Sequence, residues 1–278
     1  MKLSFKELKK DNFMMVGIII FLLLIFIGIF APIMSSYSPV ESSNQVFLKP
    51  SMSHLLGTND IGQDIFSRLV HGLRTSIVTS IAVGILATFI AAFVGTIAPL
   101  IGGYFDRVVL RLCDIFLVLP EFIICLLIAS YIQPNIVNLI IIISLLNWQG
   151  PLKVIRSQVI ICKNDLSVCA ARTFGASKIY ILRKYLIPQI FPIVVSTFIR
   201  NARIAVFMEA SIAYLGMVDS EMISLGKIMS NSMLFTYLDV WKWWLLPTGG
   251  VLAVFLLSLS YIAYGIENRK NIYLKEGV

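Results

Sequence analysis

Charged side chains are scarce in this chain. Asp, Glu, Lys and Arg together make up 14% of its 278 residues, whereas an ordinary soluble domain carries about 25%. Hydrophobic residues make up 58%, and the mean hydropathy is +0.87. This composition excludes an ordinary soluble domain and predicts a protein that sits in a lipid bilayer.

Cysteine and histidine are also few, with four and two copies. No two cysteines form a Cys-x-x-Cys pair, and none has metal-ligand spacing with a histidine, so neither a zinc site nor a disulfide framework is predicted. We therefore expect no metal site and interpret the cysteines as small apolar core residues. They are Cys113, Cys125, Cys162 and Cys169.

Catalytic motifs are missing as well. No segment matches the phosphate-binding pattern Gly-x-x-x-x-Gly-Lys-[Ser/Thr], because the Gly226-Lys227 pair precedes Ile228 and lacks the upstream glycine. His54 and His71 both fall outside the apolar runs, so an intramembrane nucleophile would have no histidine base. We expect no catalytic residue and no cofactor bound by this chain.

Long apolar runs are what the chain has instead. A helix needs about 20 residues to cross the hydrocarbon layer of a membrane, and we predict six such spans, the fourth of them short. A signal peptide explains the first run poorly, because about 22 apolar residues exceed the usual length of its hydrophobic part. The predicted spans are residues 13–34, 76–101, 108–132, 136–148, 189–215 and 243–266.

The basic residues predict the orientation of these spans. The formal net charge of +8 comes from residues that flank apolar runs, not from a polar face with interleaved aromatic side chains, so nucleic-acid binding is not predicted. Cytoplasmic flanks accumulate Lys and Arg. With both termini in the cytoplasm, the external segments hold few of the 23 basic residues, namely Lys49, Arg68, Arg74, Lys227 and Lys242.

The resulting organisation has cytoplasmic tails at residues 1–12 and 267–278 and a membrane core at residues 76–266. Residues 35–75 form an external segment. Within it, apolar residues recur every four positions and predict an interfacial amphipathic helix that leads into the second span. These residues are Ile65, Leu69 and Leu73.

The longest cytoplasmic connection, residues 150–188, contains the polar, basic stretch NDLSVCAARTFGASKIYILRKYLIP. Asn164 or Asp165 can cap a first helix, which Gly175 then breaks, and Ser177 can cap a second helix. We expect a short helical hairpin. Its small residues would let another surface approach closely.

Three motifs resemble one family. AARTFGASKIYILRKYLIP has paired Ala170 and Ala171, then Gly175, and Pro188 closing the second helix, and it resembles the EAA loop of permease subunits in bacterial ABC importers. HLLGTNDIGQDIFSRLVHGLRTS is similar to the LGTD-x-x-GRD-x-x-SR-x-x-x-G-x-R signature of the dipeptide, oligopeptide and nickel branch. EASIAYLGM is similar to the EA-x-L-SFLG segment of that branch. The likeness covers the whole chain and implies the all-α type I permease fold with six membrane helices.

The chain departs from the family pattern at four positions. Cys169 stands where the EAA loop begins with glutamate, which removes one charged contact to a partner, and Tyr185 stands where the second helix often carries histidine. In the external signature, Asn59 replaces aspartate and Gln63 replaces arginine.

The resemblance implies that several different subunits together carry out transport. The loop acts as a coupling helix that docks on a cytoplasmic ATPase subunit, one of two such subunits that bind ATP and magnesium. A second homologous permease subunit and an extracytoplasmic substrate-binding protein complete an importer in the bacterial cytoplasmic membrane. The residues assigned to coupling are Asp165, Cys169, Ala170, Ala171, Phe174, Gly175, Ala176 and Ser177.

Three ionisable residues in the fifth span are candidates for a translocation pathway, because such groups are costly in lipid and usually face a cavity or a partner. They are Arg200, Arg203 and Glu209. Internal ion pairs that fix helix packing are the alternative role.

For the whole chain, the alternatives are a self-contained secondary transporter or channel and an intramembrane enzyme. The resemblance leaves peptides and nickel or other metal chelates open as substrates.

Overall fold

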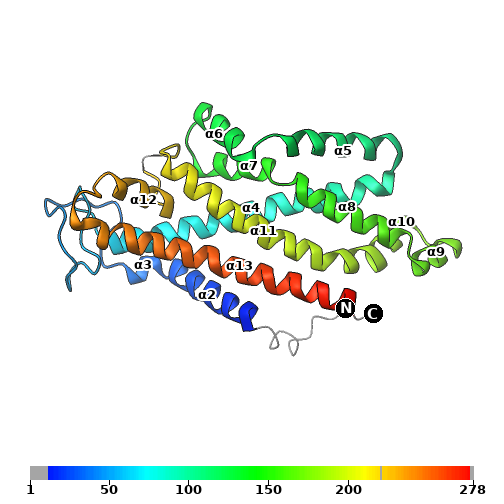
Figure 1. Ribbon diagram of the computed structural model, residues 1–278, viewed down its shortest axis with the longest axis horizontal. Helices are drawn as coiled ribbons and strands as arrows, with labels where there is room; N and C mark the ends of the chain where they lie inside the picture. The colour runs from blue at the N-terminus through cyan, green and yellow to red at the C-terminus, as the bar shows by residue number, and fades with distance from the viewer. Residues whose placement is uncertain (1–11, 220, 276–278) are drawn as a thin grey trace.

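The computed structural model describes residues 12–219 and 221–275, and the elements it contains there are helices (Figure 1). Most of the predicted N-terminal tail therefore lies outside the described residues. The helices are α2 (Asn12–Ile29), α3 (Ala31–Met34), α4 (Ile65–Ile101), α5 (Gly103–Val118), α6 (Glu121–Tyr131), α7 (Ile136–Leu146), α8 (Gln149–Lys163), α9 (Leu166–Thr173), α10 (Lys178–Ile181), the π-helix η1 (Leu182–Leu186), α11 (Ile187–Tyr214), α12 (Leu225–Met233), the 3-10 helix η2 (Asp239–Lys242) and α13 (Leu245–Lys275).

Four continuous helical stretches are long and apolar enough to cross a membrane: Asn12–Ile29, Ile65–Ile101, Ile179–Tyr214 and Asp239–Ile266. Two bent pairs, α5 with α6 and α7 with α8, bring the total to six if each pair is one span. This agrees with the predicted all-α membrane protein of six spans. The helix α13 continues through Lys275, so the predicted tail at residues 267–278 starts as helix.

The second span begins earlier than predicted. The expected interfacial helix and the span at residues 76–101 form one helix of 37 residues, α4, which the side chain of Asp64 caps by accepting a hydrogen bond from the Ser67 N–H at 2.7 Å. Leu69 and Leu73 are buried against α2 and α13. The four-residue repeat therefore belongs to the first turns of α4, which pack against other helices. These contacts extend past residue 76, where the span was predicted to begin.

Span three is sharply broken. The axes of α5 and α6 differ by 86° across Leu119 and Pro120. Proline has no N–H and pushes the preceding residue into extended conformation, and Leu119 has ψ 135°. Pro120 therefore accounts for the bend in this span.

Span four is bent by 46° between α7 and α8, so the first part of the predicted cytoplasmic connection, residues 150–163, continues as helix.

The first span divides too. Predicted as one run over residues 13–34, it consists of α2 and the single turn α3, separated at Phe30 and with Pro32 in the first turn of α3.

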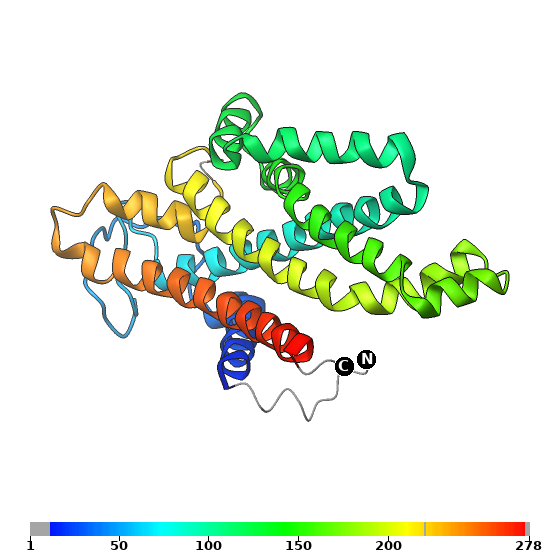
Figure 2. The same cartoon turned by 45° about the vertical axis from the view of Figure 1, so that its right-hand side comes forward.

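The helices α4 and α11 cross at the centre of the bundle, and α2 with α13 forms a layer on one side (Figures 1 and 2). Small residues allow the close crossings. The position where Gly84 would carry a Cβ lies 2.9 Å from the Phe198 ring, and the same position at Gly17 lies 2.8 Å from Tyr261 Cβ. Larger side chains there would push the helices apart. A polar contact also joins the central pair, since Ser80 Oγ donates to the Ala202 carbonyl at 3.0 Å.

Two ends of the molecule are distinct along its longest axis. Figure 1 shows α9 and α10 at one end and α12 with the loops before α4 at the other. In those loops the His54 ring contacts the Asp64 carboxylate at 2.9 Å, and buried Arg68 donates to the Pro39 carbonyl at 3.0 Å. These bonds hold the polar segment against the start of α4.

Candidate functional site

The turn from α8 into α9 begins the candidate site. Asn164 ends α8, and Asp165 caps α9 by accepting a hydrogen bond from the Ser167 N–H at 3.4 Å. The Val168 N–H donates to the Asp165 carbonyl at 3.0 Å. Of the two predicted caps, the structure therefore selects Asp165.

The end of α9 is a backbone-determined turn. Gly175 has φ +81°, a region that glycine enters at little cost. Its N–H donates to the Arg172 carbonyl, and the Ala176 N–H donates to the Ala171 carbonyl, both at 3.0 Å. These two bonds form a Schellman motif. The break predicted at Gly175 is confirmed, and its geometry fixes the angle at which the chain leaves α9.

The second helix of the hairpin departs from the prediction. Ser177 does accept a hydrogen bond from the Tyr180 N–H at 3.3 Å, at the start of α10. Pro188, however, does not end the helix, because α10 runs through η1 into α11 without a break. In an α-helix the proline ring would clash with the carbonyl four residues earlier. The wider π-helical turn before Pro188 relieves that clash.

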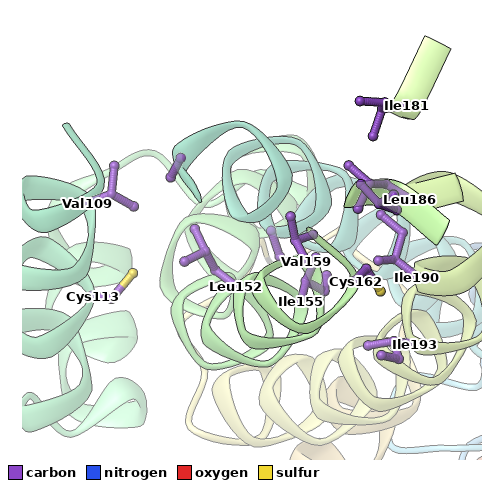
Figure 3. Close-up of a cluster of buried hydrophobic side chains, with 13 residues drawn as sticks. Val109, Cys113, Leu152, Ile155, Val159, Cys162, Ile181, Leu186, Ile190 and Ile193 are labelled. Carbon is purple, nitrogen blue, oxygen red and sulfur yellow. The ribbon is translucent and has the colours of Figure 1, made fainter. Parts of the chain in front are cut away.

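One face of this hairpin, Leu166–Ile181, is anchored to the bundle. Val168 is fully buried, and Ile181 and Leu186 pack with it in a cluster that includes Val159 and Cys162 of α8. Figure 3 shows Leu186 close to Cys162 of α8 and to Ile190. The hairpin is thus fixed at its base to α8 and α11.

The opposite face of the Leu166–Ile181 hairpin presents apolar side chains to the outside. Phe174 is 91% exposed, Leu166 is 86% exposed and Ile179 is 64% exposed. Such a patch at the tip of a rigid projection is typical of a surface that another protein covers. The small residues Ala170 and Ala171 lie beside it.

The cysteine interpretation is wrong at one position. Cys113, Cys125 and Cys162 are buried as expected, but Cys169 is exposed on α9. The helix α9 has only eight residues, and Val168 is the one that it buries. The neighbouring Cys169 therefore points away from the bundle.

The three pathway candidates of α11 lie in different surroundings. Arg200 is exposed, and the position where Gly150 would carry a Cβ lies 3.7 Å from its guanidinium. Arg203 instead lines a pocket with residues of α2 and α13. Although three positions apart, the two arginines face different helices.

Glu209, the third pathway candidate, is fully buried between α11 and α4, where its Oε2 accepts a hydrogen bond from Ser76 Oγ at 3.0 Å. Its Oε1 has no partner among the described residues.

Two ion pairs between α5 and α8 were missed by the sequence reasoning. Asp106 pairs with Arg156 at 2.6 Å, and Asp114 pairs with Lys153 at 2.5 Å. A search for opposite charges on facing helices could have found them, since Lys153 and Arg156 lie one turn apart. Within the described part of the chain, no three His, Cys, Asp or Glu residues gather as metal ligands.

Six possible spans, two of them bent, and a projecting helical hairpin define a multi-pass membrane protein. Over residues 84–272 the chain matches the family of binding-protein-dependent transport system inner membrane components, and over residues 1–50 it matches the N-terminal TM domain of oligopeptide transport permease C. The chain belongs to the first family, as a permease of the peptide class of ABC importers, and is a multi-pass protein of the inner membrane.

Relatives match nearly the whole chain. The dipeptide transport system permease DppC of Alkalihalophilus pseudofirmus is 31% identical over 95% of this chain and 87% of its own length. In Bacillus subtilis, the permeases DppC and OppC, of a dipeptide and an oligopeptide transport system, are each 28% identical. They cover 95% and 94% of this chain, and 81% and 85% of their own lengths.

Proposed function

We propose that this chain forms part of the channel through which peptides enter the cell, and that the Leu166–Ile181 hairpin receives motion from a separate ATPase. The observation that carries this proposal is the pairing of a buried base at Val168 with a tip at which Phe174 is 91% exposed. A partner that grips such a tip can move the bundle through α8 and α11.

The mechanism is a shift between two packings of the membrane helices, which nucleotide on the partner biases. The short helix α9, ended by a hydrogen-bonded turn, transmits a displacement without melting. Its base packs on α8, and α8 is tied to α5 by the Arg156–Asp106 pair. Movement at the tip therefore reaches the broken third span.

Partners complete the transporter. We infer two cytoplasmic ATPase subunits that bind ATP and magnesium, a second homologous permease and an external peptide-binding protein. Both termini and the hairpin lie in the cytoplasm in this proposal. Val118 of α5 is 83% exposed and Tyr131 of α6 is 85% exposed. These exposed apolar side chains support our inference that protein or lipid covers the surface formed by α5 and α6.

The relatives support a proposal for the substrate class, because their names specify dipeptide and oligopeptide transport. We therefore propose peptides rather than nickel or metal chelates. Arg200 lies near Glu121, a residue of opposite charge at the start of α6, and we place both beside the pathway. Competition of labelled peptide uptake by unlabelled peptide, but not by a nickel chelate, is the expected result.

Cys169 offers a test of the hairpin assignment, because it is exposed on α9 while the other three cysteines are buried. A membrane-impermeant maleimide should label it in inverted vesicles and not in intact spheroplasts. Adding the ATPase subunits should protect it, and Cys169→Ser should abolish the label. Labelling from outside, or no protection by the ATPase, would overturn the proposal.

A further inference from the structure

A pocket of about 460 Å³ lies where three membrane helices meet. The first turn of α2, the middle of α11 and the second half of α13 contribute its walls. Its lining residues are Phe13, Arg203, Ser260, Tyr261, Ala263 and Tyr264.

Apolar packing closes the inner side of this pocket. Ile199, one turn before Arg203 on α11, clusters with Ala263 of α13. The Phe13 ring lies 5.8 Å from the Tyr261 ring and 6.3 Å from the Tyr264 ring, measured between centroids. Phe13 and Tyr264 remain 57% and 52% exposed, so the mouth opens away from the bundle.

The pocket lies at one boundary of the membrane. Phe13 opens the apolar run of the α2 span and follows the polar sequence Lys9-Lys10-Asp11-Asn12. Side chains on a helix point toward its N-terminus, and α11 starts on the hairpin side of the molecule (Figure 1). The Arg203 side chain is therefore directed toward the boundary at which α2 begins, where long basic side chains reach headgroups.

Unused hydrogen-bond donors line the mouth. Arg203 forms no hydrogen bond or ion pair with another described residue, and the hydroxyls of Tyr261 and Tyr264 have no described partner either. Ser260 is different, because its hydroxyl donates to the Leu256 carbonyl at 2.8 Å. A guanidinium and two phenol hydroxyls suit a phosphate, which accepts several hydrogen bonds and carries the opposite charge.

We propose that this pocket binds the phosphate headgroup of an anionic phospholipid. Arg203 pairs with the phosphate, the two tyrosines donate to it, and the acyl chains lie along the exposed apolar surface of α2 and α13, which includes Leu257 at 51% exposure. Basic pockets between membrane helices on the cytoplasmic side hold such headgroups. The flanking sequence is basic as well, with Lys9 and Lys10 before α2.

Native mass spectrometry of the purified transporter complex tests this directly, with phosphatidylglycerol as probe and phosphatidylcholine, which has a phosphate but no net charge, as the comparison. Arg203→Gln should lower the retained phosphatidylglycerol about fivefold, the effect of one surface charge on lipid binding. Arg203→Lys should keep most of it. Arg107→Gln, at an exposed arginine of α5, should change nothing. Phosphatidylcholine retention should be equal in all variants, and added inorganic phosphate should not displace the lipid.

Several results would overturn the proposal. Equal phosphatidylglycerol retention by wild type and Arg203→Gln excludes the site, and displacement by inorganic phosphate shows a free-anion site instead. Glu267 follows Tyr264 by three residues on α13. A matching loss of phosphatidylglycerol in Glu267→Gln indicates that Arg203 belongs to an internal ion pair instead. A further variant carries Tyr264→Cys together with Cys169→Ser. If a lipid-soluble maleimide fails to label the new thiol in the complex, the second permease covers the pocket. Lipid retention is measured without transport, so failure here leaves the coupling assignment untouched.

Discussion

Asp106 of α5 accepts two hydrogen bonds from Arg156 of α8, from Nε at 2.7 Å and from Nη2 at 2.6 Å. The two side chains are only 15% and 20% exposed. This paired contact fixes the first half of the broken third span to the helix that carries the hairpin. Charge-assisted, two-point hydrogen bonds of this kind are stronger than ordinary ones.

Breaking the pair should destabilise the protein. We expect Asp106→Asn and Arg156→Gln each to cost roughly 2 kcal/mol, because each leaves a largely buried charged partner unpaired. The double variant should cost less than the sum of the two. Thermal unfolding of the purified complex measures this. Asp239→Asn is the matched control, since its pair with Lys242 is 74% and 54% exposed and solvent screening should leave it little effect on stability.

Gly175→Pro should uncouple ATP hydrolysis from uptake. Proline holds φ near −65° and has no N–H, whereas Gly175 has φ +81° and donates to the Arg172 carbonyl. The turn that orients α9 cannot form. Membrane insertion and yield should remain normal, and Gly175→Asn, which tolerates positive φ, should retain uptake. Wild-type uptake by the proline variant would argue against coupling through this turn.

Phe174→Asp should weaken binding of the ATPase. An aromatic anchor at the centre of an interface contributes about 2 kcal/mol or more, so the affinity should fall roughly 30-fold. Copurification of the ATPase with this chain provides the measurement. Phe174→Leu keeps an apolar side chain and should bind within about threefold of wild type. Since Phe174 is 91% exposed, neither change should alter the melting temperature.

Replacing Glu209 with glutamine should destabilise the protein less than replacing it with alanine. Its Oε2 accepts a hydrogen bond from Ser76 Oγ at 3.0 Å in a fully buried site, and Glu209→Gln keeps an acceptor of the same shape. Glu209→Ala leaves Ser76 without that acceptor and opens a cavity, which should cost about 2–4 kcal/mol. Melting temperatures of the two variants decide the point. Equal destabilisation would show that the carboxylate itself is required.

Arg200→Met should reduce peptide uptake more than it reduces assembly. Arg200 is exposed beside Gly150 and close to Glu121, a position suited to a pathway and not to core packing. Uptake in proteoliposomes and complex yield after purification are the two measurements, with Arg107→Met as the control. Losses of equal size in both would favour a packing role.

Local chemistry explains what the sequence determined. Apolar runs long enough for a bilayer fixed the class and the spans, because lipid admits few charges. Asp165 and Gly175 act through their own backbone or the next few residues, so the helix cap and the turn were predictable. The family resemblance added the role of the hairpin, which none of these residues reveals alone.

Contacts between distant segments decided the rest. Leu69 and Leu73 look amphipathic in sequence, yet α2 and α13 bury them and make α4 one helix. The Asp106–Arg156 pair joins residues 50 positions apart.

The arginines of α11 show the same limit. Arg203 faces α13 while Arg200 faces α8, because neighbouring helices approach α11 from different sides. Sequence periodicity gives the direction of a side chain on its own helix, but only the packed bundle determines what that side chain meets.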